Sequence, residues 1–174
     1  MLTKDFDSKL KRLTLGFWCS RAELEQLADA VLRHPKRIEK LLRLIFHENP
    51  RVQAQAARIL VRVADKQPGC VQPYKDLLIE EVANGKQWIV QVSFCKIIPQ
   101  LKLTVREVNR VVKLLLEYLN EERSVVKVCA MQALFDLALM RPKLKEEIFP
   151  LIESMTHTGT PAMRARGRLL RKKL

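Results

Sequence analysis

The sequence predicts an all-α fold: a right-handed α–α superhelix (α-solenoid) of about three and a half helical hairpins, with a divergent repeat at the N-terminal end. Three observations support this prediction. Apolar residues recur at helical spacing, the pattern returns every 36 to 38 residues, and prolines return at the same points within it. One helical hairpin cannot cover its own apolar face, so neighbouring hairpins are expected to stack.

The first helix of each repeat is marked by an apolar residue, followed mainly by small or apolar residues four, seven and eight positions later. Residues spaced in this way share one face of an α-helix. The marker residues are Val52, Val90, Val126 and Met163. Proline precedes the first helix at Pro50 and Pro161, where the missing N–H is tolerated.

A second helical segment follows in the first three repeats, 25 and 26 positions after the marker residue. The residues at these positions are Leu77, Leu78, Leu115, Leu116, Leu151 and Ile152. Pro68 and Pro142 separate the two helices at equivalent positions. The last repeat has only its first helix, with Met163, Gly167, Leu170 and Leu174 expected to face inward.

The chain is expected to be a single solenoid domain, 1–174. Its parts are divergent N-terminal helices at 1–48, repeats at 49–85, 86–121 and 122–159, and a terminal half-repeat at 160–174. Ser20 and Glu23 have the spacing of a capping box, which predicts a helix start there. Residues 3–13 are expected to form an amphipathic helix with Phe6, Leu10 and Leu13 inward.

The first helix of each repeat opens with an apolar–polar pair, seen at Val52-Gln53, Val90-Gln91, Val126-Lys127 and Met163-Arg164. With the leucine-rich second helix, this pattern resembles the HEAT repeat family over roughly residues 49–174. The resemblance implies a fold and not a particular function. It also implies that the second helices line the concave face of the array.

The composition limits the classes of protein to which the chain can belong. Its four cysteines have no CxxC spacing, so we expect reduced, buried thiols and no zinc site. The apolar run 13–19 is short for a signal peptide, and no run is long enough to span a membrane. We therefore expect a cytoplasmic protein with no membrane partner.

The net charge of +13 is concentrated at the end of the chain, where the final fifteen residues contain basic but no acidic side chains. These candidate polyanion-contacting residues are Arg164, Arg166, Arg168, Arg171, Lys172 and Lys173. Three interpretations remain open: a solvated helix face, a docking site for an acidic protein, or a phosphate-contacting patch for nucleic acid. Arg106, Arg110 and Lys113 form a second candidate patch on one side of a helix, diluted by Glu107 and Glu117.

The sequence contains no recognisable catalytic motif, so we expect no catalytic residue, no cofactor, no metal and no small-molecule substrate. Some glycosylases that remove alkylated DNA bases are HEAT-like, but they would need aromatics and a carboxylate in a basic groove. Here Asp76 is the best spare carboxylate, and Trp18 and Trp88 are the two tryptophans. We expect a non-enzymatic module that binds another protein, with nucleic-acid binding as the alternative and the glycosylase a distant third.

Overall fold

The computed structural model describes residues 2–82, 85 and 87–173, and these residues form helices without any strand. The prediction of an all-α fold is confirmed. The chain divides into two compact units, Met1–Lys102 and Leu103–Leu174. Leu174, which the sequence placed on the inner face of the last helix, lies outside the described residues.

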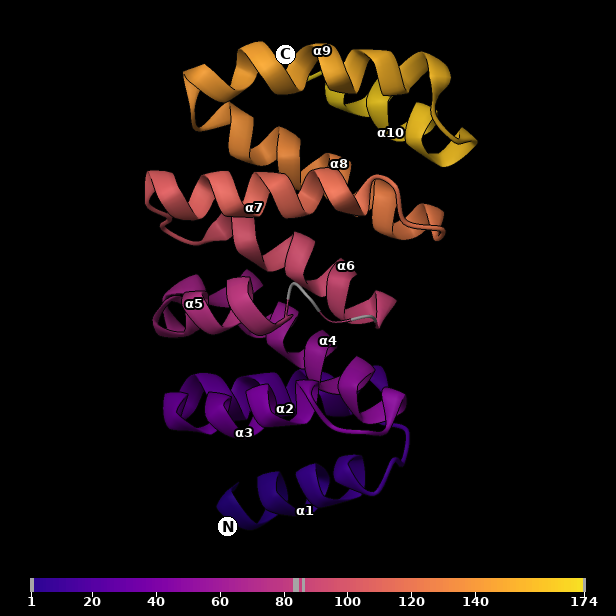
Figure 1. The fold of residues 1–174 in the computed structure, drawn as a ribbon. Coiled ribbons are helices and arrows are strands. Elements are labelled where there is room, and N and C mark those ends of the chain that lie inside the picture. Colours follow the sequence, from indigo (N-terminus) through magenta and orange to yellow (C-terminus); the bar gives the residue numbers. More distant parts are fainter. Residues whose placement is uncertain (1, 83–84, 86, 174) are drawn as a thin grey trace. The chain divides into compact units, whose positions relative to one another are not determined.

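The N-terminal unit is built around α4 (Pro50–Lys66), which packs against α2, α3 and α6 (Figure 1). Its buried face includes Val52, Ala56, Ile59 and Leu60. This is the helical stripe that the sequence predicted, and the small alanines allow neighbouring helices to approach closely. The other main helices of this unit are α1 (Leu2–Thr14), α2 (Arg21–Arg33), α3 (Ile38–Ile45) and α6 (Trp88–Ile97).

Both features predicted near the N-terminus are confirmed. Phe6, Leu10 and Leu13 are buried on α1. Ser20 caps α2: its hydroxyl accepts from the Glu23 N–H at 3.2 Å, and Glu23 Oε2 accepts from the Ser20 N–H at 2.8 Å.

The second helical segment of the repeat at 49–85 is more broken than the leucine pattern indicated. After the 3-10 turns Pro68–Cys70 and Gln72–Tyr74, it consists of the short α5 (Lys75–Leu77) and a π-type turn, Leu78–Val82. Prolines at the starts of both 3-10 turns lack the N–H that a continuous helix needs. Leu78 and Ile79 are nevertheless buried, so the apolar pattern still predicted the inward side.

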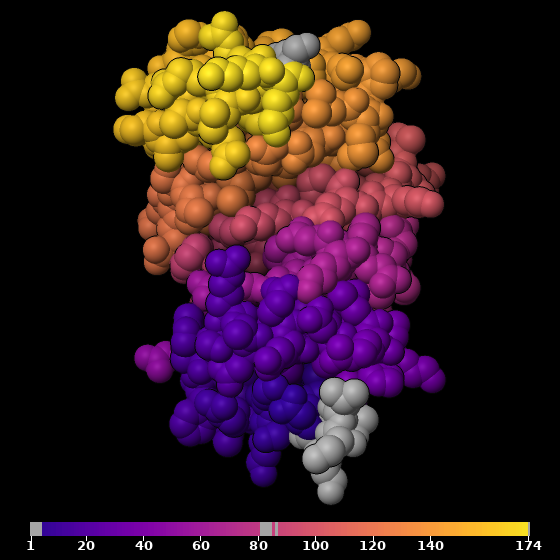
Figure 2. Space-filling model, turned by 180° about the vertical axis from the view of Figure 1, so that it is seen from behind, coloured from indigo at the N-terminus to yellow at the C-terminus, as the bar shows by residue number. Residues whose placement is uncertain are grey.

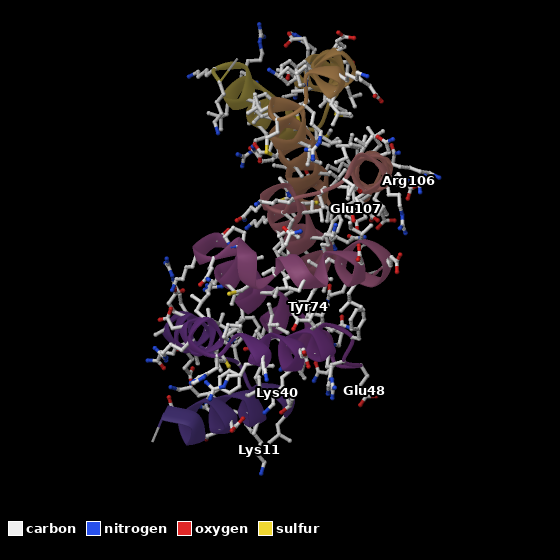
Figure 3. All side chains as sticks on the ribbon, turned by 90° about the vertical axis from the view of Figure 1, so that its left-hand side faces the viewer. Lys11, Lys40, Glu48, Tyr74, Arg106 and Glu107 are labelled. Carbon is white, nitrogen blue, oxygen red and sulfur yellow. The ribbon has the colours of Figure 1, made fainter. Side chains whose placement is uncertain are left out.

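The C-terminal unit consists of α7 (Val105–Tyr118), α8 (Ser124–Leu139), α9 (Pro142–Thr158) and α10 (Pro161–Arg171). Helix α8 contacts the other three and is apolar around most of its circumference, as expected of a helix covered on several sides. Phe135 on α8 stacks on Phe149 of α9 with ring centroids 5.5 Å apart. Helices α7 and α9 lie on one side of α8, and α10 lies on the other (Figures 1 and 3).

Candidate functional site

Helix α10 and the two lysines that follow it contain the six basic residues predicted at the end of the chain, and the N-terminus of the helix is capped. The Thr160 hydroxyl accepts from the Met163 N–H at 3.3 Å, and Pro161 occupies the first helical turn. Thr160 Oγ1 also lies 2.9 Å from the Ser124 hydroxyl at the start of α8. These contacts fix the start of α10 against its neighbour.

The inner face of α10 is formed by Met163, Gly167 and Leu170, all buried as the sequence predicted. Gly167 lies directly against Thr156 of α9, and a β-carbon at this position would overlap the threonine hydroxyl. It would also come within 3.1 Å of the terminal methyl group of Met131 on α8. The glycine therefore allows α10 to pack closely against α8 and α9. The basic side chains on its opposite face then point outward.

Three of the six basic residues interact with polar groups of α8 and α9. Arg171 Nε lies 3.3 Å from Glu153 Oε2, and Arg166 donates to Gln132 Oε1 at 3.2 Å. Burial raises the pKa of Asp136, while the Gln132 amide, Lys173 and Arg166 oppose this increase. These three cations serve partly to balance charge and polarity on the neighbouring helices.

The remaining three, Arg164, Arg168 and Lys172, form a row at intervals of four residues along the exposed side of α10. Within the part of the chain that the structure describes, none of them has a carboxylate within ion-pair distance. Leu169 is 54% exposed close to this row. We call Arg164, Arg168 and Lys172 the α10 row. Figure 2, which views the molecule from behind, shows α10 at the surface.

The second predicted patch lies elsewhere on the same unit. Arg106, Arg110 and Lys113 are exposed on α7, opposite its buried valines. Glu107 is partly occupied by capping, because its carboxylate accepts from the Thr104 N–H at 2.6 Å. Figure 3 shows Arg106 pointing away from the side on which α10 lies. The two predicted basic clusters therefore belong to helices that pack on opposite sides of α8.

A concavity in the N-terminal unit bears on the glycosylase alternative. It has a volume of about 340 Å³ and is lined by Glu39, Leu42, Arg43, Phe46, Tyr74 and Leu77. The Tyr74 hydroxyl donates to Glu39 at 3.2 Å, and burial together with this carboxylate raises the tyrosine pKa. Asp76, the carboxylate that the sequence singled out, is exposed and does not line this concavity.

The cysteines lie mostly in the core, and two histidines contact nearby residues. Cys19, Cys70 and Cys95 are buried as expected, whereas Cys129 is only partly buried, and none of the four is in a disulfide. His47 accepts from the Asn49 N–H at 3.0 Å, and His157 lies 3.0 Å from Glu153. Across the described residues, His, Cys, Asp and Glu side chains form no group able to hold a metal ion.

The helices described in the structure include none long and apolar enough to cross a membrane.

Comparison with protein families agrees with the stacked helical hairpins. The family model described as a HEAT repeat domain matches residues 12–174. The chain belongs to the HEAT repeat family. The match begins well before residue 49, so it includes α2 and α3, which the sequence pattern treated as divergent, but only the last residues of α1. A search of curated proteins finds no match. The fold is thus a HEAT-type α-solenoid.

Proposed function

We propose that the protein is a non-enzymatic HEAT-repeat module that binds another protein, and that the α10 row docks an acidic segment of that partner. The observation that carries the proposal is the exposure of Arg164, Arg168 and Lys172 without carboxylate partners in the described structure. Ion pairs within α10 and its neighbours leave this row available. The row lies on α10, which the buried Gly167 allows to pack closely against α8 and α9.

The side chains around the row favour a protein partner. Arginine is enriched in protein interfaces, and a charged row next to an apolar side chain can provide both steering and burial. Leu169, exposed beside the row, supplies the apolar component. We expect the partner to present carboxylates with an apolar residue between them.

The alternative is nucleic-acid binding through phosphate contacts. It is favoured by the run of six basic residues in the last fifteen positions. Helix α10 has no aromatic side chain, so it offers nothing on which bases can stack. This alternative therefore predicts binding to duplex phosphates with little preference for sequence and with strong salt dependence.

The test compares two triple variants with the same change in net charge. One is Arg164→Glu, Arg168→Glu and Lys172→Glu, and the control is Arg106→Glu, Arg110→Glu and Lys113→Glu on α7. Binding to labelled polyglutamate and to a labelled DNA duplex is measured by fluorescence anisotropy at rising salt. The proposal expects the α10 variant to lose polyglutamate binding and the α7 control to retain most of it.

A duplex-binding protein would behave differently. A protein that contacts 6–10 phosphates should lose roughly 10³–10⁵ in affinity between about 50 and 200 mM salt. Tight duplex binding with such a slope, together with weak polyglutamate binding, would favour the nucleic-acid alternative. Equal losses in both variants would show that bulk charge, not the α10 row, attracts the polyanion. A pulldown at physiological salt that recovers only nucleic acid would also contradict the protein-binding proposal.

A further inference from the structure

The loop between α1 and α2 exposes three large apolar side chains in close succession. Leu15 is 66% exposed, Phe17 58% and Trp18 59%. Their neighbours Leu13 and Cys19 are buried, so the apolar run 13–19 is divided between the core and solvent. Core packing explains the buried pair and leaves the exposed three unexplained. We call Leu15, Phe17 and Trp18 the apolar loop.

The backbone of this loop is held in place at its helical end. The Gly16 N–H donates to the Leu13 carbonyl at 2.9 Å, and the Phe17 N–H donates to the Arg12 carbonyl at 3.1 Å. This pair of bonds is a Schellman motif, which terminates α1. Gly16 has a φ of 81°, a conformation in which a side chain is strained. A β-carbon there would also lie 2.9 Å from Asn49 Nδ2.

A buried glutamine holds the other end of the loop. Gln55 on α4 has 0% exposure. Its amide nitrogen donates to the Phe17 carbonyl at 3.0 Å, and its amide oxygen accepts from the Cys19 N–H at 2.6 Å. Phe17 and Trp18 are therefore exposed from a braced backbone. Exposed apolar side chains that are grouped together mark an interaction site, whereas singly scattered ones need no explanation.

Cations lie around the apolar loop. The Arg58 guanidinium is 5.3 Å from the centre of the Trp18 ring. Lys11, Arg21 and Arg51 are exposed on the helices that adjoin the loop and its Asn49 support, and they have no ion-pair partner in the described structure. Of the nearby carboxylates, Glu23 is bonded to Arg12 and Ser20, and Glu48 is exposed. The surroundings therefore carry a net positive charge.

We propose that the apolar loop is an interfacial anchor for an anionic phospholipid bilayer. Phe17, Trp18 and Leu15 enter the boundary between headgroups and acyl chains, while Lys11, Arg21 and Arg51 contact lipid phosphates. Apolar and aromatic side chains flanked by Lys and Arg are the composition that binds this boundary. The sequence analysis expected no membrane partner because no apolar run is long enough to span a bilayer, and an interfacial loop does not need such a run.

Two observations favour a bilayer over other partners. The three side chains are each more than half exposed, so they project from the surface. A fluid lipid interface can accommodate such side chains without a matching pocket. Leu15, the most exposed of the three, has no ring to stack on a nucleic-acid base, yet it adds apolar surface for lipid. This inference uses residues of the N-terminal unit only, so it stands or falls separately from the proposal for α10.

The test is flotation of the full-length chain with phosphatidylserine-containing vesicles and with pure phosphatidylcholine vesicles. The variant Phe17→Ser with Trp18→Ser is compared with Leu139→Ser with Met140→Ser, which also removes two adjacent exposed apolar side chains. We expect binding to the anionic vesicles, a loss of roughly tenfold or more in the loop variant, and little change in the control. Arg21→Gln and Arg51→Gln should each weaken binding about fivefold.

Trp18 fluorescence supplies a second readout. In a Trp88→Phe background Trp18 is the one remaining tryptophan. Its emission should shift to the blue and become shielded from a soluble quencher when anionic vesicles are added. Absence of vesicle binding, or equal losses in the loop variant and its control, would overturn the inference. So would quenching of Trp18 by an oligonucleotide without any response to vesicles. Circular dichroism melts confirm that the variants are folded.

Discussion

At the scale of single residues, Gln55 ties α4 to the loop between α1 and α2. It bonds to Cys19 and Phe17, which lie 36 and 38 positions before it in the chain. Its side chain is fully buried, and both ends of its amide are bonded to the backbone of the α1–α2 loop. Loss of this amide leaves the buried Cys19 N–H and the partly buried Phe17 carbonyl without their side-chain partner. Each unsatisfied group costs about 1–3 kcal/mol.

We therefore expect Gln55→Leu to lower the free energy of unfolding by about 2–4 kcal/mol, as measured by urea denaturation. Gln53→Leu, two positions away, is the control and should cost less, because Gln53 is only partly buried and its side chain makes one hydrogen bond, to the His47 carbonyl. If both substitutions cost the same, the two bonds from Gln55 to the loop contribute no more to stability than the partly buried Gln53 does.

Gly167 is a second position where one added carbon atom is expected to change the stability of the fold. A methyl group would meet Thr156, whose hydroxyl is bonded to the Ile152 carbonyl at 2.7 Å and is therefore not free to rotate away. Alanine favours a helix over glycine by about 1 kcal/mol, but overpacking costs about 1–3 kcal/mol. We expect Gly167→Ala to be destabilising in urea denaturation. Adding Thr156→Ala should restore part of the loss, and failure to do so would contradict this packing explanation.

At the scale of elements, the Ser20–Glu23 capping box makes the stability of α2 depend on pH. Hydrogen bonds from Ser20, first its backbone N–H, and the nearby Arg12 lower the pKa of the Glu23 carboxyl. A carboxyl with a lowered folded-state pKa contributes stability above its unfolded pKa. That contribution is lost as pH falls through the folded-state pKa.

We expect Ser20→Ala to lower the free energy of unfolding by about 1 kcal/mol at neutral pH. The penalty should shrink in acid, where Glu23 is protonated in both states. Urea denaturation at neutral and acid pH measures both values. Thr104→Ala, which removes the equivalent cap of α7, is a matched comparison in the other unit. A penalty that grows in acid would contradict the role given to the Glu23 carboxylate.

The helices could be predicted from the sequence because their determinants are local. Apolar spacing predicted the buried faces of α4 and α10, and Ser20 and Glu23 predicted the start of α2. The apolar loop could not be predicted in this way. Whether Phe17 and Trp18 face the core depends on bonds to Gln55, and a glutamine within a helical stripe gives no local sign of such a role.

The candidate basic sites were predicted only in part for the same reason. The spacing of Arg164, Arg168 and Lys172 already places them on one side of a helix. The carboxylates and amides that engage Arg166 and Arg171 belong to other helices, α8 and α9. Which cations remain available to a partner therefore emerged only when the helices were packed together.

At the scale of the whole molecule, the folded and the unfolded chain both carry the net charge of +13, but the like charges lie closer together in the folded chain. Repulsion among like charges opposes the compact state, and salt screens it over a Debye length of about 10 Å at 0.1 M. Added sodium chloride should therefore raise the unfolding midpoint modestly. A polyanion differs from salt because it can bind both states, and it stabilises the protein only if it binds the folded state more tightly.

This difference distinguishes a binding surface that is assembled on folding from a general effect of excess positive charge. If folding assembles the α10 row into a binding surface, polyglutamate should raise the unfolding midpoint beyond the effect of sodium chloride at equal ionic strength. Reversing the charges of Arg164, Arg168 and Lys172 should abolish that extra increase, and reversing the α7 cluster should leave most of it. The unfolded chain keeps the remaining basic residues in every variant. A polyanion that lowers the midpoint would therefore show that scattered charge binds better than the row, and would refute the proposed docking site.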